Sequence, residues 1–258
     1  MLHRSLLAGG FVHGSTLGVG DLRVVHAFDS GCVKRLTYAS RVRWRLLSGV
    51  SEEDVRLLLS VARRRRFERG EVVFHCDDPA DSLHLIASGR FAVRVMTPLG
   101  DTVWIAVRGA GENFGEMALI DDAARRSATV SALEAAETFA VYKPEFDRLR
   151  SSYPGIDRVL IAFLAGEVRM LNERLLEALY LPAERRLLRR LLELSSIYRT
   201  EDAMALIPLT QEELAEFTGA SRATVNRVLR DEQERGTLER HRGKIRVIDV
   251  ELLAKRAR

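Results

Sequence analysis

Short β-rich segments separated by turn residues constrain the fold of this chain more than any other feature. Between residues 71 and 142 these segments are 71–75, 83–86, 90–95, 103–107, 128–132 and 138–142. The turn signals around them are Arg69-Gly70, Asp77-Asp78-Pro79, Ser88-Gly89, Pro98-Leu99-Gly100 and Gly109-Ala110-Gly111. Strand segments punctuated at this spacing predict an antiparallel sandwich, barrel or roll.

Helical patterns flank the strand region. Ser51-Glu52-Glu53-Asp54 followed by leucines predicts a short amphipathic helix with acidic residues in its first turn. After Pro154-Gly155, a second apolar series has spacings of 3, 4, 3, 4 and 3: Ile161, Leu164, Val168, Leu171, Leu175 and Ala178. This heptad seam can bury against an identical helix of a second subunit, and packing on its own domain is the alternative that spacing leaves open. Pro182 ends the helix and is the candidate hinge.

Composition excludes several classes of protein. The chain has 258 residues, 47% of them hydrophobic, which is enough for one or two domains with buried cores. No apolar run approaches the roughly 20 residues that span a bilayer, so we expect no membrane partner. Cys32 and Cys76 are too few for a disulfide scaffold or a four-thiolate cluster, and a reducing, cytoplasmic location is the simplest expectation.

The formal net charge of +4 conceals an uneven distribution. Residues 1–48 carry 7 basic and 2 acidic residues, residues 49–180 carry 17 and 21, and residues 181–258 carry 16 and 13. The balances are therefore +5, −4 and +3. The acidic middle is therefore not expected to contact a polyanion, and the +3 of the C-terminal part is modest, so any such contact would depend on where a few arginines lie.

The segment at residues 113–128 interrupts the regular series of predicted strands, and its residue types are the most informative about function in the middle region. Gly115 precedes a short helical turn whose free N–H groups suit an anion. Glu116 could accept a hydrogen bond from a sugar hydroxyl, whereas Arg126 and Ser127 suit a phosphate. From residue types alone, an ordinary ion pair between Glu116 and Arg126 is the competing interpretation.

This loop resembles the phosphate-binding cassette of the CRP/FNR (cyclic-AMP receptor protein) family. Phe114-Gly115-Glu116 and Arg126-Ser127-Ala128 match it without an insertion. The resemblance implies a cyclic-nucleotide-binding β-roll in which Glu116 holds the ribose 2′-hydroxyl, and Arg126, Ser127 and the backbone around Gly115 hold the cyclic phosphate. The expected ligand-binding residues are Gly115, Glu116, Met117, Ala118, Arg126, Ser127, Ala128 and Asn172, with cAMP as the expected effector and no metal or other cofactor.

One departure from the family lies on the long helix. The family carries a Thr-Ser pair there that contacts the adenine across the dimer interface, whereas this chain has Met170-Leu171-Asn172. Asn172 could still bond a base edge, but the departure puts adenine selectivity in question. A haem held by His75 or His84 is a weaker alternative for this domain.

The C-terminal sequence predicts a helix-turn-helix. Residues 183–195 form an amphipathic helix, and Thr210 with Glu213 forms a capping box at the start of the next one. Gly219 permits a tight turn, and Ser221 caps a helix that is anchored by Val225, Val228 and Leu229. That leaves Arg222, Ala223, Asn226 and Arg227 outside, where two arginines and an asparagine suit guanine and adenine edges in a major groove.

A basic hairpin follows, at residues 236–248. Its tip carries Arg240, Arg242 and Lys244, which could contact phosphates and supply affinity without sequence information. The region resembles the C-terminal domain of the CRP/FNR family, and the resemblance covers residues 46–250. Arg222 and Arg227 match its base-reading arginines, but Ala223 replaces the usual glutamate. The expected DNA-binding residues are Thr210, Gln211, Ser221, Arg222, Ala223, Thr224, Asn226, Arg227, Arg242 and Lys244.

Together these patterns predict an α+β protein with four parts. They are a 1–44 extension, a 45–152 β-roll, a 153–181 dimerisation helix and hinge, and a 182–258 winged helix-turn-helix. The expected function is a homodimeric, cAMP-responsive transcription regulator that binds a palindromic operator in double-stranded DNA, with RNA polymerase as a partner implied by the family. A regulator independent of cyclic nucleotide is the same-fold alternative. A cyclic-nucleotide-regulated enzyme is the remote alternative, because no catalytic motif occurs and we expect no enzyme activity.

Overall fold

The computed structural model describes residues 42–48, 50–120, 124–153, 155–199 and 205–258. The first described elements are the 3-10 helix η1 (Arg45–Leu47) and the helix α2 (Glu52–Val61). The predicted amphipathic helix is confirmed, with Glu52, Glu53 and Asp54 in its first turn, and the side chain of Ser51 caps it by accepting a hydrogen bond from the backbone N–H of Asp54. Cys32 and nearly all of the predicted extension lie outside the described residues.

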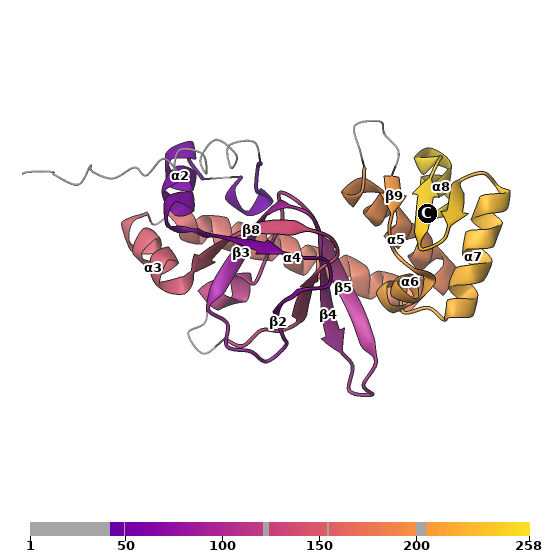
Figure 1. Ribbon diagram of the computed structural model, residues 1–258, viewed down its shortest axis with the longest axis horizontal. Coiled ribbons are helices and arrows are strands. Elements are labelled where there is room, and N and C mark those ends of the chain that lie inside the picture. Colours follow the sequence, from indigo (N-terminus) through magenta and orange to yellow (C-terminus); the bar gives the residue numbers. More distant parts are fainter. Residues whose placement is uncertain (1–41, 49, 121–123, 154, 200–204) are drawn as a thin grey trace, which may run out of the picture.

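Two four-stranded antiparallel sheets form the roll (Figure 1). One has the order β1-β8-β3-β6 and the other the order β2-β7-β4-β5. The strand bounds are β1 (Arg63–Phe67), β2 (Val72–Phe74), β3 (Ser82–Ser88), β4 (Phe91–Met96), β5 (Thr102–Arg108), β6 (Asn113–Phe114), β7 (Thr129–Ala132) and β8 (Ala136–Tyr142). The predicted antiparallel roll is therefore confirmed.

Strand β1 was absent from the prediction. It consists of four exposed arginines, Arg63 to Arg66, followed by the buried Phe67, so it lacks the apolar alternation that marks a half-buried strand. It forms because it pairs antiparallel with β8 along its whole length. A position at the edge of the sheet tolerates this charge, since the arginine side chains remain in water.

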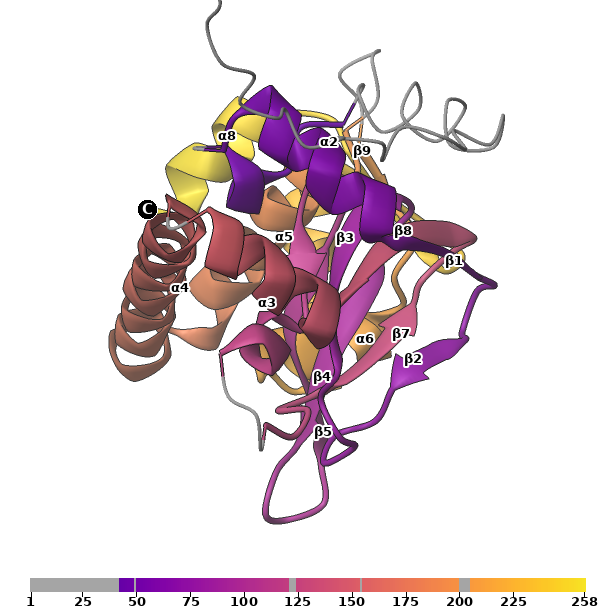
Figure 2. The same cartoon turned by 90° about the vertical axis from the view of Figure 1, so that its left-hand side faces the viewer.

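Strand β3 is buried on both faces. Ile86 faces Phe67, Phe91 and Phe114 in the core between the two sheets. Leu83, Leu85 and Ala87 face the other way and pack against α2, α4 (Gly155–Tyr180) and the helix α3 (Lys143–Ser152). Figure 2 shows α2 and α3 on the β3–β8 side of the roll.

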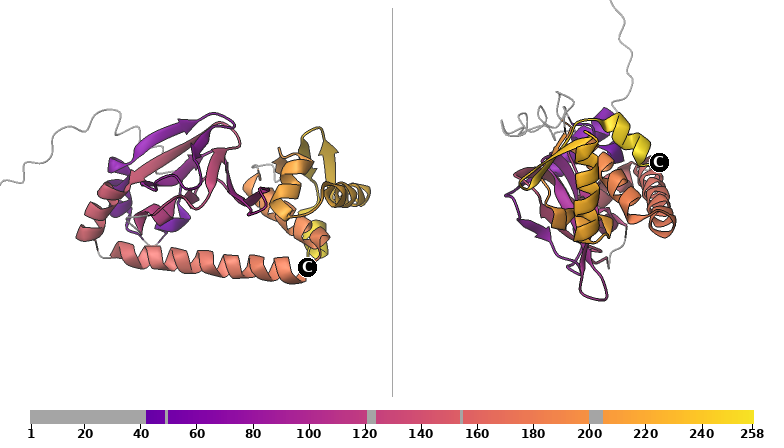
Figure 3. Two further views of the ribbon diagram at one scale, coloured as in Figure 1. Left: turned by 90° about the horizontal axis from the view of Figure 1, so that it is seen from below. Right: turned by 90° about the vertical axis from the view of Figure 1, so that its right-hand side faces the viewer.

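Helix α4 runs along the roll and on to the C-terminal domain (Figure 3). The predicted apolar seam lies largely in solvent in the single chain: Ile161 is 66% exposed, Leu171 59% and Leu175 57%. Among the described residues, no helix is long and apolar enough to cross a membrane.

The C-terminal domain is a winged helix-turn-helix, as predicted. Its elements are α5 (Ala183–Ile197), β9 (Ala205–Ile207), α6 (Gln211–Thr218), α7 (Arg222–Glu234), β10 (Leu238–His241), β11 (Lys244–Val247) and α8 (Val250–Arg256). Both halves of the Thr210–Glu213 capping box form. Gly219 ends α6 in the left-handed conformation with φ 62°, and Ser221 caps α7. Strand β9 and helix α8 were not predicted.

Candidate functional site

A cavity of about 340 Å³, here called the roll cavity, lies between the 113–128 segment and α4. The cassette residues predicted to bind a ligand all line it: Gly115, Glu116, Met117, Ala118, Arg126, Ser127 and Ala128. Helix α4 contributes Leu164, Glu167, Val168, Met170, Leu171 and Arg174. The cavity is therefore polar at the cassette and mainly apolar along the helix.

Gly115 is required by close packing at the cassette. It precedes the 3-10 helix η2 (Glu116–Leu119) in the left-handed conformation, with φ 83°. A Cβ at this position would lie 2.7 Å from Nη1 of Arg126 and 2.8 Å from the backbone oxygen of Ser82. No side chain fits there, so the glycine lets the backbone approach the guanidinium closely.

The Arg126 guanidinium is buried and held in a fixed orientation. It donates to the backbone oxygen of Ser82 at 2.7 Å, to Ser82 Oγ at 3.0 Å and to Asp81 Oδ1 at 2.9 Å, and it lies over the ring of Phe74. Its carboxylate partner is thus Asp81 rather than Glu116. Burial lowers the pKa of Arg126, and Asp81 opposes that shift. The Nε of Arg126 is buried and has no hydrogen-bond partner within the described part of the chain.

Glu116 is held at the same cavity by a different set of neighbours. Its Oε2 accepts a hydrogen bond of 3.3 Å from Nδ2 of Asn113. Burial raises the pKa of this carboxyl, and the positive charge of Arg108 opposes the rise. Arg108 in turn pairs with Glu167 of α4 at 2.7 Å. A carboxylate in this position can accept a hydrogen bond from a ligand hydroxyl.

Asn172 is placed differently from the cassette residues. It is exposed on α4 and is not among the residues that line the roll cavity of its own chain. Its neighbours Met170 and Leu171 line that cavity instead. A role for Asn172 in ligand binding stays a prediction.

The predicted DNA-binding residues lie on α6, α7 and the β10–β11 hairpin. A groove of about 410 Å³ brings together Thr210, Gln211, Arg222, Arg240, Arg242 and Lys244. Arg222, Ala223 and Arg227 are exposed on α7, and Asn226 is partly exposed beside them. Arg227 pairs with Glu184 at 2.6 Å, which leaves both side chains accessible to solvent.

Three of the predicted DNA-binding side chains also have structural roles. Thr210 Oγ1 accepts from the N–H of Glu213 at 3.2 Å, and Ser221 Oγ accepts from the N–H of Thr224 at 3.1 Å. The hydroxyls of Ser221 and Thr224 are 2.9 Å apart. These caps orient the N-termini of α6 and α7, where N–H groups and local dipoles favour a phosphate.

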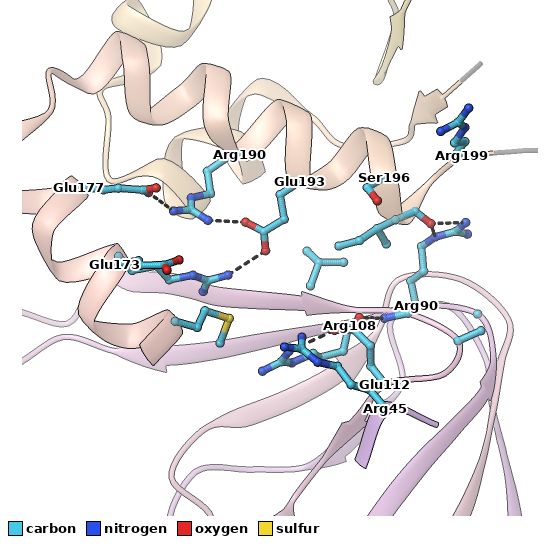
Figure 4. Close-up of a pocket in the computed structure, with 17 residues that line it drawn as sticks. Arg45, Arg90, Arg108, Glu112, Glu173, Glu177, Arg190, Glu193, Ser196 and Arg199 are labelled. Atoms are coloured by element: carbon cyan, nitrogen blue, oxygen red, sulfur yellow. Dashed lines mark hydrogen bonds and ion pairs between the residues drawn. The ribbon is translucent and has the colours of Figure 1, made fainter. Parts of the chain in front are cut away.

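A second cavity, here called the interdomain cleft, lies between the roll, α4 and α5 and measures about 820 Å³ (Figure 4). Charged side chains cross it: Arg190 pairs with both Glu177 and Glu193, and the Arg90 guanidinium donates to the backbone oxygen of Ile197 at 2.9 and 3.0 Å. This cleft was not predictable from the sequence, because its residues come from segments far apart in the chain and share no local pattern.

No group of three His, Cys, Asp or Glu side chains in the part of the chain that the structure describes could hold a metal ion. His84, one of the two candidate haem ligands, is stacked on Phe114 with ring centroids 4.9 Å apart, and its Nδ1 lies 3.0 Å from Thr138 Oγ1. Its packing accounts for its presence in the strand.

Comparison with known proteins finds family models that match the roll and the C-terminal helix-turn-helix. The Cyclic nucleotide-binding domain family model matches residues 64–153, and the Crp-like helix-turn-helix domain model matches residues 185–256. A CRP-like cAMP-activated global transcriptional regulator of Mycobacterium tuberculosis is 32% identical over 219 residues, which cover 83% of this chain and 96% of that regulator. The chain belongs to the CRP/FNR family of transcription regulators.

Other members of the CRP/FNR family show the same relationship. The cyclic AMP receptor protein of Thermus thermophilus is 32% identical over 208 residues, covering 81% of this chain and 94% of that protein. The c-di-GMP-responsive regulator CLP of Xanthomonas campestris shares the fold, with a TM-score of 0.65 and 22% identity over 76% of this chain and 99% of that one. This CRP/FNR regulator therefore combines a cyclic-nucleotide-binding domain with a DNA-binding helix-turn-helix, as the sequence resemblance implied.

Proposed function

We propose that this regulator is a homodimer whose affinity for a palindromic operator is set by a cyclic nucleotide, with cAMP the first candidate. The observation that carries the proposal is Arg126, a buried guanidinium at the roll cavity whose Nε has no hydrogen-bond partner among the described residues. A buried donor without a partner costs free energy, and a bound phosphate oxygen would remove that cost. The cAMP-activated relatives that are 32% identical supply the first ligand to test.

The shape of the roll cavity suits a nucleotide with a cyclic phosphate. The phosphate would lie at Arg126, Ser127 and the N–H groups after Gly115, and a ribose hydroxyl would donate to Glu116. The base would then extend toward Leu164, Val168 and Leu171 of α4. Apolar side chains on that helix suit the faces of a planar ring.

Dimerisation through α4 is supported by the exposed apolar seam. Ile161, Val168, Leu171 and Leu175 are each more than half exposed in the single chain, and such a seam is stabilised by a second copy. The same pairing could bring Asn172 of one subunit toward the cavity of the other. Leu175→Glu should convert the dimer to a monomer in sedimentation equilibrium, and an unchanged dimer would contradict this part of the proposal.

The second candidate is a regulator that binds DNA independently of cyclic nucleotide. Leu171 favours it, because it places an apolar side chain on the cavity wall in the region where the family carries hydroxyls. In that case cAMP and cGMP would leave operator affinity unchanged. RNA polymerase contact belongs to the proposal only through the family.

Calorimetric titration with cAMP and cGMP tests the proposal directly. The wild-type protein should bind cAMP, and Arg126→Ala should abolish or strongly weaken binding, since it removes the guanidinium. Arg125→Ala is the matched control, because Arg125 lines the same cavity but is exposed and donates to the backbone oxygen of Asp77. Binding that survives Arg126→Ala unchanged would contradict the proposed phosphate site.

A further inference from the structure

Arg174 lies on the boundary between the two cavities. It lines both the roll cavity and the interdomain cleft, as do Arg108 and Met170. Arg108 bonds to Glu112 and Glu167, which belong to the roll and α4. Arg174 differs from both, because its polar contacts extend to the DNA-binding domain.

The Arg174 guanidinium joins three elements. Its own backbone belongs to α4, Nη1 donates to the backbone oxygen of Ile105 on β5, and Nη2 pairs with Oε1 of Glu193 on α5 at 2.8 Å. The side chain is 21% exposed, so most of the group is withdrawn from water. Because the guanidinium is planar and rigid, it can bond to Ile105 and Glu193 at the same time only when β5 and α5 are at one particular distance from each other.

The connection continues beyond Glu193. Glu193 also pairs with Arg190, which pairs with Glu177 back on α4 (Figure 4). A set of charged side chains therefore connects α5 to α4, and within this set Arg174 also reaches the roll. Arg186 of α5 adds a contact to the backbone oxygen of Ala178 on α4. Helix α5 packs directly on α6 and α7, since Leu187, Leu191 and Leu194 share a core with Val225 and Leu229.

We infer that Arg174 couples occupation of the roll cavity to the position of the helix-turn-helix, an inference that rests on the proposed function. Ile105 of β5 and Leu171 and Arg174 of α4 all line the roll cavity. A ligand base between β5 and α4 sets the distance between Ile105 and Arg174. Arg174 can bond to both Ile105 and Glu193 at one β5–α4 distance but not at another. Ligand binding would therefore shift the equilibrium between two positions of α5 and of α7, which carries Arg222 and Arg227.

Operator affinity with and without cAMP tests this inference. The operator is a duplex that the wild-type protein selects from a random pool in the presence of cAMP. Coupling in the wild type is expected at about 5- to 150-fold, the usual range for allosteric proteins. In Arg174→Met and in Glu193→Met, which remove the donor and the acceptor of the Arg174–Glu193 pair, the ratio of operator affinities with and without cAMP should fall to within twofold of one while cAMP binding persists. Glu193 does not line the roll cavity, so its variant separates coupling from ligand contact.

Arg189→Met is the matched control. Arg189 pairs with Glu177 at 2.8 Å in the same charged set but is not among the residues that line either cavity, so its variant should keep wild-type coupling. In protein labelled with 5-fluorotryptophan, the ¹⁹F resonance of Trp104, assigned with Trp104→Phe, should move on cAMP addition in the wild type and in Arg189→Met but not in Arg174→Met.

Three results would overturn the inference. Wild-type coupling retained in both Arg174→Met and Glu193→Met would show that another route carries the signal. Loss of cAMP binding in Arg174→Met with full coupling in Glu193→Met would make Arg174 a ligand contact only. If cAMP and cGMP leave the operator affinity of the wild-type protein unchanged, the proposed function is overturned together with this inference.

Discussion

The indole N–H of Trp104 on β5 donates a hydrogen bond of 2.7 Å to Oε2 of Glu216 on α6. Trp104 is 2% exposed, and its ring also faces Phe217. Ala92, Trp104 and Val107 of the roll share one apolar core with the helix-turn-helix. The DNA-binding domain is therefore packed on the outer face of the second sheet, rather than joined to the roll by α4 alone.

Loss of the Trp104 partner should destabilise the protein. Glu216→Ala leaves a buried N–H without an acceptor, and we expect the free energy of unfolding to fall by about 1–3 kcal/mol. Glu216→Gln retains an acceptor and should lose less. Urea denaturation measures both variants, and in a Trp104→Phe background the two substitutions should differ little. Equal losses for Ala and Gln in the wild-type background would contradict a stabilising hydrogen bond.

Gly115→Ala should damage both the fold and the ligand site. At φ 83° a Cβ costs about 1–2 kcal/mol, and here it would also clash with Arg126 Nη1 and the Ser82 oxygen. Gly100→Ala is the matched control, because Gly100 has φ 89° with nothing within 4 Å of the added Cβ. Only Gly115→Ala should weaken cAMP binding, by about tenfold or more for the loss of one charge-assisted contact. Similar cAMP affinities in the two variants would count against the packing argument.

Local signals made much of the fold and the cassette predictable. The Thr210–Glu213 box, the Ser51 and Ser221 caps and the turn at Gly219 each depend on residues within a few positions of one another. Contacts between distant segments were not predictable. Asp81 pairs with Arg126 across 45 residues, and Trp104 bonds to Glu216 across 112. Strand β1 formed from arginines because pairing with β8 outweighed a weak local preference.

Stability should fall in mild acid because of His84. Burial, with Arg126 and Arg65 nearby, lowers the pKa of His84 from 6.5 to about 3. Between pH 6.5 and pH 3, His84 is protonated in the unfolded chain but neutral in the folded chain. The contribution of neutral His84 to the free energy of unfolding is therefore fully present above pH 6.5 and declines by about 1.4 kcal/mol per pH unit as the pH falls toward 3.

His84→Phe removes this titration and places an aromatic ring among Phe67, Phe74 and Phe114. From pH 6 to pH 5 the wild type should lose about 1 kcal/mol more unfolding free energy than the variant. His75 is exposed, and His75→Asn should behave like the wild type. Parallel pH profiles for the wild type and His84→Phe would contradict the assignment.

Arg227 and Lys244 should affect DNA binding in different ways. Arg227→Ala should cost about 1–3 kcal/mol on the selected operator and relax specificity at one base pair. Lys244→Ala should weaken specific and random duplexes alike and reduce the salt dependence by about one counterion. Anisotropy titrations at several salt concentrations separate the two effects. If Lys244→Ala relaxed specificity and Arg227→Ala weakened all duplexes alike, Lys244 would be the base contact and Arg227 the phosphate contact, contrary to this assignment.

The central claim, that a cyclic nucleotide in the roll cavity and DNA at the helix-turn-helix act on one equilibrium, is tested most directly by a reciprocal measurement. Calorimetry gives the cAMP dissociation constant of the wild-type protein, free and saturated with operator. Because coupling is mutual, cAMP should bind the operator complex more tightly by the same factor by which cAMP tightens operator binding. A cAMP dissociation constant that is the same with and without operator would contradict the claim.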